Sequence, residues 1–170
     1  MSTSNLRRHF IILVQMAFLA IFSGQALSDN VSLHYTDAGT AKDSGPADGV
    51  FETLIDPPGS VLNNGYQEDR TAIELDISSI PGGSTIESAS LTFIHNLSDT
   101  SRQLHIYGYQ GDGSVTLDDF TIGELVASND VISPFQVDVT TFVQNLVDAE
   151  ATYAGFSIRE ADDTDRKSVV

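Results

Sequence analysis

Apolar and polar residues alternate along several short segments of the chain, a pattern typical of β-strands with one buried face. In the clearest segment, residues 71–77, Ile73, Leu75 and Ile77 occupy alternate positions, with Glu74 between two of them. Gly, Pro, Asn and Asp separate such segments. The pattern predicts further strands at residues 31–35, 50–55, 88–96, 103–109, 135–139 and 153–159. We expect the core to include Leu75, Leu91, Phe93, Ile106, Val137 and Phe156.

One segment has helical spacing instead. The apolar residues that follow Thr140 recur on one face of a helix, at Phe142, Val143, Leu146 and Val147. This spacing predicts a short helix near residues 140–148. Residues 36–49 are rich in Gly, Ala, Asp and Ser, which predicts a long loop. Seven or eight short strands with one helix predict an all-β fold, an antiparallel β-sandwich.

The N-terminus has the features of an export signal. Arg7 and Arg8 precede an apolar run from Phe10 to Phe22, and small residues follow as far as Ala26. The run is too short to cross a membrane as a helix, although an uncleaved signal anchor is the alternative. We expect a signal peptide at 1–26, cleaved after Ala26 or near Ser28, and a single β-sandwich domain at 27–170. The mature protein would then be secreted, extracellular or periplasmic, and no longer bound to the membrane.

The charge of the chain limits its partners. The sequence has 24 acidic and 8 basic residues, for a formal charge of −16. The leader carries two of the basic residues and no acid, so its removal lowers the charge by two, to −18. Such a field repels nucleic acids and anionic membrane surfaces, and it suits divalent cations. The chain has no cysteine, which excludes disulfides and thiolate metal sites.

Several blocks of the sequence resemble the secreted DNRLRE-type domains. An acidic-Arg pair, a strand and a Ser-Ser-Ile-Pro loop follow one another within residues 68–81, and the next strand begins at residues 88–92 with Ser-Ala-Ser-Leu-Thr. Further matching blocks lie at residues 137–143 and 153–159. Residues 107–115 are similar to a segment of related exported proteins that carry a C-terminal sorting tail.

The resemblance implies a jelly-roll sandwich like those of non-catalytic carbohydrate-binding modules, some of which recognise acidic or cell-wall polysaccharides. Such domains close with one further strand, and the exported relatives then add a hydrophobic sorting helix and a basic tail. Here the sequence stops after residues 166–170. The resemblance therefore implies that the last strand and the tail are missing, or that residues 168–170 are the start of that strand, in a truncated chain.

One outward strand face carries aromatic residues suited to sugars. His105, Tyr107 and Tyr109 alternate along the predicted strand at 103–109. Sugar rings present C–H patches to aromatic faces, while polar side chains bind the hydroxyls. We therefore interpret these three residues as a candidate carbohydrate-binding face. The alternative is ordinary β-propensity, with the face covered by a loop or the helix.

A second candidate site is a loop rich in acids. Residues 112–119 resemble the second half of a calcium loop, with Asp112 and Asp119 as ligands for a structural Ca²⁺. The leading carboxylates of such loops are absent, so other ligands would have to come from elsewhere in the fold. The alternative is a turn in which Thr116 or Asp118 caps a helical turn through Phe120.

No arrangement of residues in the sequence predicts catalysis. The acids nearest to a glycosidase pair are Glu68, Asp69, Glu74 and Asp76. Glu74 and Asp76 are typical of an exposed strand face, Arg70 is expected to form a salt bridge with a neighbouring acid, and nothing sets an acid against a nucleophile. Serine nucleophile, phosphate-loop and zinc motifs are absent from the sequence. We expect no enzyme activity. The first hypothesis is an exported binding module for a polysaccharide or another cell-envelope component, and the alternative is a structural or adhesive envelope protein without a small ligand.

Overall fold

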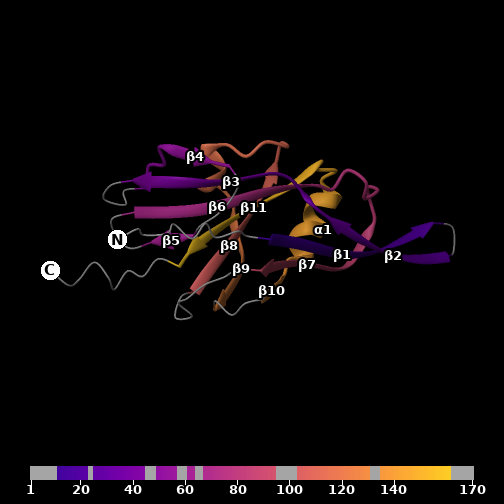
Figure 1. The fold of residues 1–170 in the computed structure, drawn as a ribbon. Helices are drawn as coiled ribbons and strands as arrows, with labels where there is room; N and C mark the ends of the chain where they lie inside the picture. Colours follow the sequence, from indigo (N-terminus) through magenta and orange to yellow (C-terminus); the bar gives the residue numbers. More distant parts are fainter. Residues whose placement is uncertain are drawn as a thin grey trace.

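The computed structural model is an all-β sandwich with one α-helix, as the alternation predicts (Figure 1). It describes residues 11–22, 25–44, 49–56, 61–63, 67–94, 103–130 and 135–161. The strands form a large and a small sheet, and the neighbouring strands in each sheet are antiparallel.

The large sheet has seven strands, six of them in the order β4-β3-β6-β11-β8-β9. A short strand, β5 (Leu62–Asn63), pairs with β6 off this path. In sheet order the six strands are β4 (Thr53–Ile55), β3 (Tyr35–Ser44), β6 (Gln67–Asp76), β11 (Tyr153–Glu160), β8 (Gln103–Gly111) and β9 (Glu124–Asp130).

The small sheet has the order β10-β7-β1-β2. Its strands are β10 (Phe135–Asp138), β7 (Thr85–Ile94), β1 (Ile11–Phe22) and β2 (Gln25–Leu33). Strand β1 falls within the apolar run predicted to be part of a signal peptide, and it lies between β7 and β2 in the small sheet. Removal of the leader stays a prediction; it would take β1 out of the sheet and separate β2 from β7.

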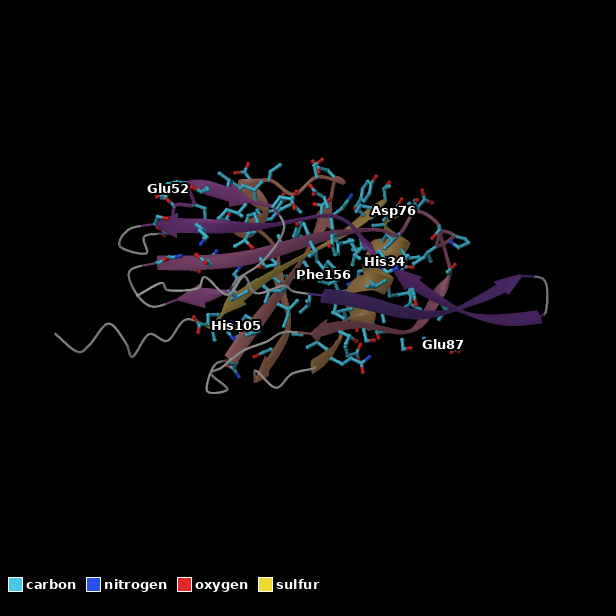
Figure 2. All side chains as sticks on the ribbon, in the orientation of Figure 1. His34, Glu52, Asp76, Glu87, His105 and Phe156 are labelled. Atoms are coloured by element: carbon cyan, nitrogen blue, oxygen red, sulfur yellow. The ribbon has the colours of Figure 1, made fainter. Side chains whose placement is uncertain are left out.

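One apolar cluster joins the two sheets and the helix. It contains Leu91 from the small sheet together with Leu75, Ile106 and Phe156 from the large sheet. Helix α1 (Thr140–Asp148) adds Phe142, Val143, Leu146 and Val147. Figure 2 shows Phe156 inside the body of the molecule, whereas Glu87 lies at its periphery. The expected core is confirmed at Leu75, Leu91, Ile106, Val137 and Phe156, and the side chain of Phe93 lies outside the described residues.

The structure differs from the predicted strands at residues 35–44 and 124–130. Residues 36–49 do not form one long loop, because residues 35–44 form strand β3, paired with β6 and β4. Strand β9 was not predicted at all. A β-bulge where it pairs with β8 shifts its register by one residue, which interrupts the simple alternation that marks the other strands.

The outer face of the large sheet is partly covered by residues 112–123, which run from the end of β8 to the start of β9. They include a 3-10 helix, η1 (Leu117–Phe120), which begins after the capping residue Thr116 as the capping alternative predicted. Phe120 is fully buried there in a second apolar cluster with Ala41, Phe51, Ala72 and Val115. We call residues 112–123 the cover loop.

Candidate functional site

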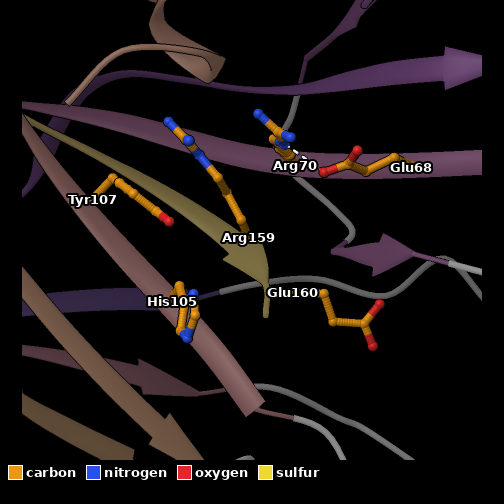
Figure 3. Close-up of a pocket in the computed structure, with 6 residues that line it drawn as sticks. All are labelled: Glu68, Arg70, His105, Tyr107, Arg159 and Glu160. Carbon is orange, nitrogen blue, oxygen red and sulfur yellow. Dashed lines mark hydrogen bonds and ion pairs between the residues drawn. The ribbon is translucent and has the colours of Figure 1, made fainter. Parts of the chain in front are cut away.

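The part of the outer face that the cover loop leaves open contains a polar groove. Its cavity measures about 170 Å³. The side chains come from three adjacent strands, β6, β8 and β11 (Figure 3). The groove is lined by Glu68, Arg70, His105, Tyr107, Arg159 and Glu160.

Strand register explains why these residues meet. Arg159 lies directly opposite His105, and Ser157 lies opposite both Tyr107 on β8 and Ala72 on β6. Side chains of directly opposed residues in an antiparallel pair share one face of the sheet. Three segments far apart in sequence therefore present their outward side chains to one groove.

Arg159 and Tyr107 form a stacked pair inside the groove. The Arg159 guanidinium carbon lies 3.9 Å from the centre of the Tyr107 ring, within the range of a cation–π contact. Its NH2 group donates to the carbonyl of Ile122 over 2.6 Å, and its Nε donates to Ser157 Oγ over 3.3 Å. One ring face of Tyr107 is thus covered, and a ligand would meet the stacked pair rather than a bare ring.

Arg70, on the β6 side of the groove, is also held by several contacts. Its Nε donates to Glu68 Oε1 over 2.5 Å, and its NH1 donates to the carbonyl of Phe120 over 2.7 Å. The guanidinium also lies 4.7 Å from the centre of the Phe51 ring. Both arginines are therefore fixed by main-chain carbonyls of the cover loop, and their geometry is set before any ligand arrives.

Apolar side chains border the groove. Leu125 lies opposite Tyr107 in the pairing of β8 with β9, next to the bulge, and it is 52% exposed. Ile122, whose carbonyl binds Arg159, is 44% exposed. A β-bulge can re-aim side chains beside a site. The result is a polar groove with an apolar margin.

The structure divides the three residues of the candidate carbohydrate-binding face. His105 and Tyr107 both line the groove, with their rings 6.3 Å apart. Tyr109 lies further along the same face, but it is only 5% exposed and does not line the groove. Its ring packs over Gly155, where an added Cβ would lie 2.3 Å from the ring. At Tyr109, therefore, the alternative interpretation applies, in which a loop covers this face.

Glu74 lies on the outer face, as predicted, but the cover loop buries it completely. Its Oε2 accepts hydrogen bonds from the amides of Gly113 and Asp112, over 2.5 and 3.1 Å. Burial raises the pKa of Glu74, and the negative charges of Asp119 and Asp112 raise it further. Burial also raises the pKa of neighbouring Tyr109. A polar residue on an outward position was not enough to predict exposure.

The two candidate calcium ligands have local hydrogen-bonding roles. Asp112 Oδ1 accepts from the amide of Ser114 over 3.0 Å. Asp119 Oδ2 accepts from the amide and the hydroxyl of Thr116, over 2.7 and 2.9 Å, which forms a capping box. In the described part of the chain, no three His, Asp or Glu side chains group together as a metal ion would require. Calcium binding stays a prediction.

The other acids of β6 also have partners in the structure. Glu68 pairs with Arg70, and Asp69 lies 3.5 Å from the ammonium group of Lys42. Asp76 Oδ1 accepts from the amide of Ser78 over 2.8 Å, and hydrogen bonds from Ser78 lower the pKa of Asp76. Each carboxylate thus stabilises the local fold.

Four of the six groove residues were not predicted as ligand-binding residues. The sequence predicts a salt bridge for Arg70, presents Glu68 only as a rejected glycosidase acid and places Arg159 at the end of a predicted strand, whereas Glu160 lies just outside that strand. Only the outward position of Arg159 follows from the predicted alternation, because the other three residues lie outside the predicted strands at 71–77 and 153–159. Their meeting does not follow from it, because it depends on the pairing of β6 with β11.

Comparisons with known proteins add no relative. No protein-family model matches the chain, and no curated protein and no solved structure matches it. Among the described residues, none of the helices is long and apolar enough to cross a membrane.

Proposed function

We propose that this chain is a non-catalytic binding module that recognises a polysaccharide through the groove on the outer face of the large sheet. The observation that carries the proposal is the stacked pair of Tyr107 and Arg159, fixed in a groove that also holds two carboxylates. Sugar hydroxyls both donate and accept hydrogen bonds. Carboxylates accept from them, and guanidinium groups donate to them.

The apolar margin supports the same function. Sugar rings have apolar C–H faces as well as hydroxyl edges, so their sites combine apolar contacts with a few placed polar groups. Leu125 and Ile122 supply exposed apolar surface beside Tyr107 and Arg159. The resemblance to DNRLRE-type domains points to carbohydrate binding as well.

Charge favours a neutral polysaccharide over a polyanion. The groove holds two arginines and two glutamates, so its charges balance when His105 is neutral. The whole chain carries −16, and such a field repels a polyanion at long range. A neutral, hydroxyl-rich chain meets hydrogen-bonding groups in the groove without that repulsion.

Binding measurements on groove variants test the proposal. Isothermal titration would use soluble β-glucan, xylan and mannan as neutral probes and polygalacturonate as the anionic probe. We expect one neutral polymer to bind, and Tyr107→Ala and Arg159→Gln each to weaken binding about tenfold, which is about 1.4 kcal/mol. Glu87→Gln, on the exposed part of the small sheet, is the matched control and should bind like the wild type.

Three outcomes would count against the proposal. Binding unchanged in both groove variants would place the site elsewhere. Tighter binding of polygalacturonate than of every neutral polymer would overturn the charge argument. If no polymer binds and the protein self-associates only when calcium is added, the alternative of a structural or adhesive envelope protein is favoured, because calcium would bridge its acidic surfaces. Unfolding midpoints of all variants show whether a loss reflects the groove or the fold.

A further inference from the structure

The cover loop is anchored at its start by two carboxylates of the large sheet, that of Glu74, which is buried, and that of Asp37, which is partly buried. Glu74 Oε2 accepts hydrogen bonds from the amides of Asp112 and Gly113, and Asp37 Oδ2 accepts one from the amide of Val115 over 2.8 Å. The Glu74 carboxylate occupies space that a side chain at Gly111 would need, since an added Cβ there would lie 2.6 Å from it. This end of the loop is therefore built around the carboxylate.

The same loop holds the groove arginines at its other end. The carbonyl of Phe120 accepts from Arg70, and the carbonyl of Ile122 accepts from Arg159. The side chain of Phe120 is fully buried in the second apolar cluster, with Phe51 and Ala72. The loop thus links Glu74 to both guanidinium groups through one packed segment.

Glu74 itself lies outside the groove. It is four residues from Arg70 along β6, or about 13 Å at the rise of a strand. Its place in the sheet lies beside Gly155 and Tyr109, whereas the groove begins at the row of Tyr107 and Ser157. Any effect of Glu74 on a groove ligand must therefore pass through the cover loop or the sheet.

We propose that Glu74 is a positioning residue for the groove, which holds the start of the cover loop and thereby fixes the carbonyls that orient Arg70 and Arg159. The inference rests on the proposed function, because it concerns a groove proposed to bind a ligand. The effect of Glu74 on the cover loop and on the two arginines can still be tested without a ligand. Loss of the anchor would let both guanidinium groups sample other orientations, and ordering them again on binding would weaken affinity.

The experiment compares Glu74→Ala, which removes the acceptor, with Glu74→Gln, which keeps one. In the unliganded protein, NMR would follow the guanidinium N–H signals of Arg70 and Arg159 and the hydrogen exchange of the Asp112, Gly113 and Val115 amides. We expect Glu74→Ala to broaden the guanidinium signals and to speed amide exchange at least tenfold. Glu74→Gln should resemble the wild type. Affinity for the bound neutral polymer should fall about tenfold in Glu74→Ala alone.

Val143→Ala is the control for general stability, because it creates a cavity where helix α1 packs in the main core, on the inner face of the large sheet. An equal loss of affinity in Val143→Ala, or unchanged guanidinium signals in Glu74→Ala, would overturn the inference. If Glu74→Ala does not fold, Asp37→Ala removes the Val115 anchor and must loosen the same signals for the inference to stand. If the wild type binds no polymer, the proposed function fails, and the unliganded measurements still decide the role of Glu74.

Discussion

The two faces of the large sheet are buried in different ways. On the inner face, Ile73, Leu75 and Phe156 pack in an apolar cluster shared with the small sheet and helix α1. On the outer face, the cover loop buries a carboxylate, that of Glu74, beside a small apolar cluster around Phe120. Further along, the same face is open and polar.

The difference shows what alternation in a sequence encodes. It separates the two faces, because apolar residues at every second position must face a core. It does not say whether the polar face is exposed, since that depends on a segment that returns over the sheet. Here the returning segment buries the Glu74 carboxylate, and its own amides donate hydrogen bonds to one of the two oxygens, Oε2.

The largest effect is expected on the inner face. Phe156→Ala should lower the free energy of unfolding by about 3–5 kcal/mol, because it leaves a cavity in the main core. Urea denaturation of the variant and the wild type measures the loss. A loss below about 1 kcal/mol would mean that the inner face is not the one that holds the fold together.

A smaller effect is expected where the outer face is covered. Gly155→Ala should cost about 1–3 kcal/mol, because the new Cβ would lie 2.3 Å from the Tyr109 ring. Gly82→Ala is the control, since the nearest atom there would be 3.6 Å away, an ordinary contact. Adding Tyr109→Leu to Gly155→Ala should recover part of the loss. Equal stability of the two alanine variants would contradict the packing of Tyr109 over Gly155.

The smallest effect is expected in the pH dependence of stability, which should differ between the buried carboxylate of Glu74 and the exposed carboxylate of Asp138. The pKa of Glu74 is raised above 4.5 by burial, so its contribution to stability is present below pH 4.5 and is lost as pH rises through the folded value. The pKa of Asp138 is lowered below 3.8, because its carboxylate accepts hydrogen bonds from the side chain and the amide of Thr140. Its contribution is present above pH 3.8 and is lost as pH falls through the folded value.

Unfolding free energies from pH 3 to 7 test both signs. The stability of the wild type relative to Glu74→Gln should decrease as the pH rises above 4.5. Relative to Asp138→Asn, it should decrease as the pH falls below 3.8. A difference between wild type and Glu74→Gln that does not change with pH would show that Glu74 ionises as an exposed acid does.

The sequence alone was sufficient to predict the inner face of the large sheet and helix α1. Regular alternation identified β6, β8 and β11, and the spacing of Phe142 to Val147 identified α1, because both periods follow directly from backbone geometry. Residues 36–49 were wrongly predicted to form a loop, because small and acidic residues are typical of loops. In the structure, the strand formed by part of this region is stabilised by its pairing with β6.

The candidate site could be predicted only in part. His105 and Tyr107 stood out because two ring side chains alternate on one strand. Of the three Lys or Arg residues in the described ranges, Arg70 and Arg159 line the groove, a concentration of positive charge that appears only after folding. The groove is a product of register between strands about 50 or more residues apart, and no local pattern encodes that register.

We propose that the open part of the outer face binds glycan while the covered part positions the groove arginines. Backbone amide chemical shifts, followed by NMR during titration with oligosaccharides of the polymer that binds, test it most directly. We expect chemical-shift changes concentrated at His105, Tyr107, Leu125 and Arg159, weaker changes in the cover loop, and none around Glu87. Shifts centred on the small sheet, or no shifts at saturating oligosaccharide, would contradict it.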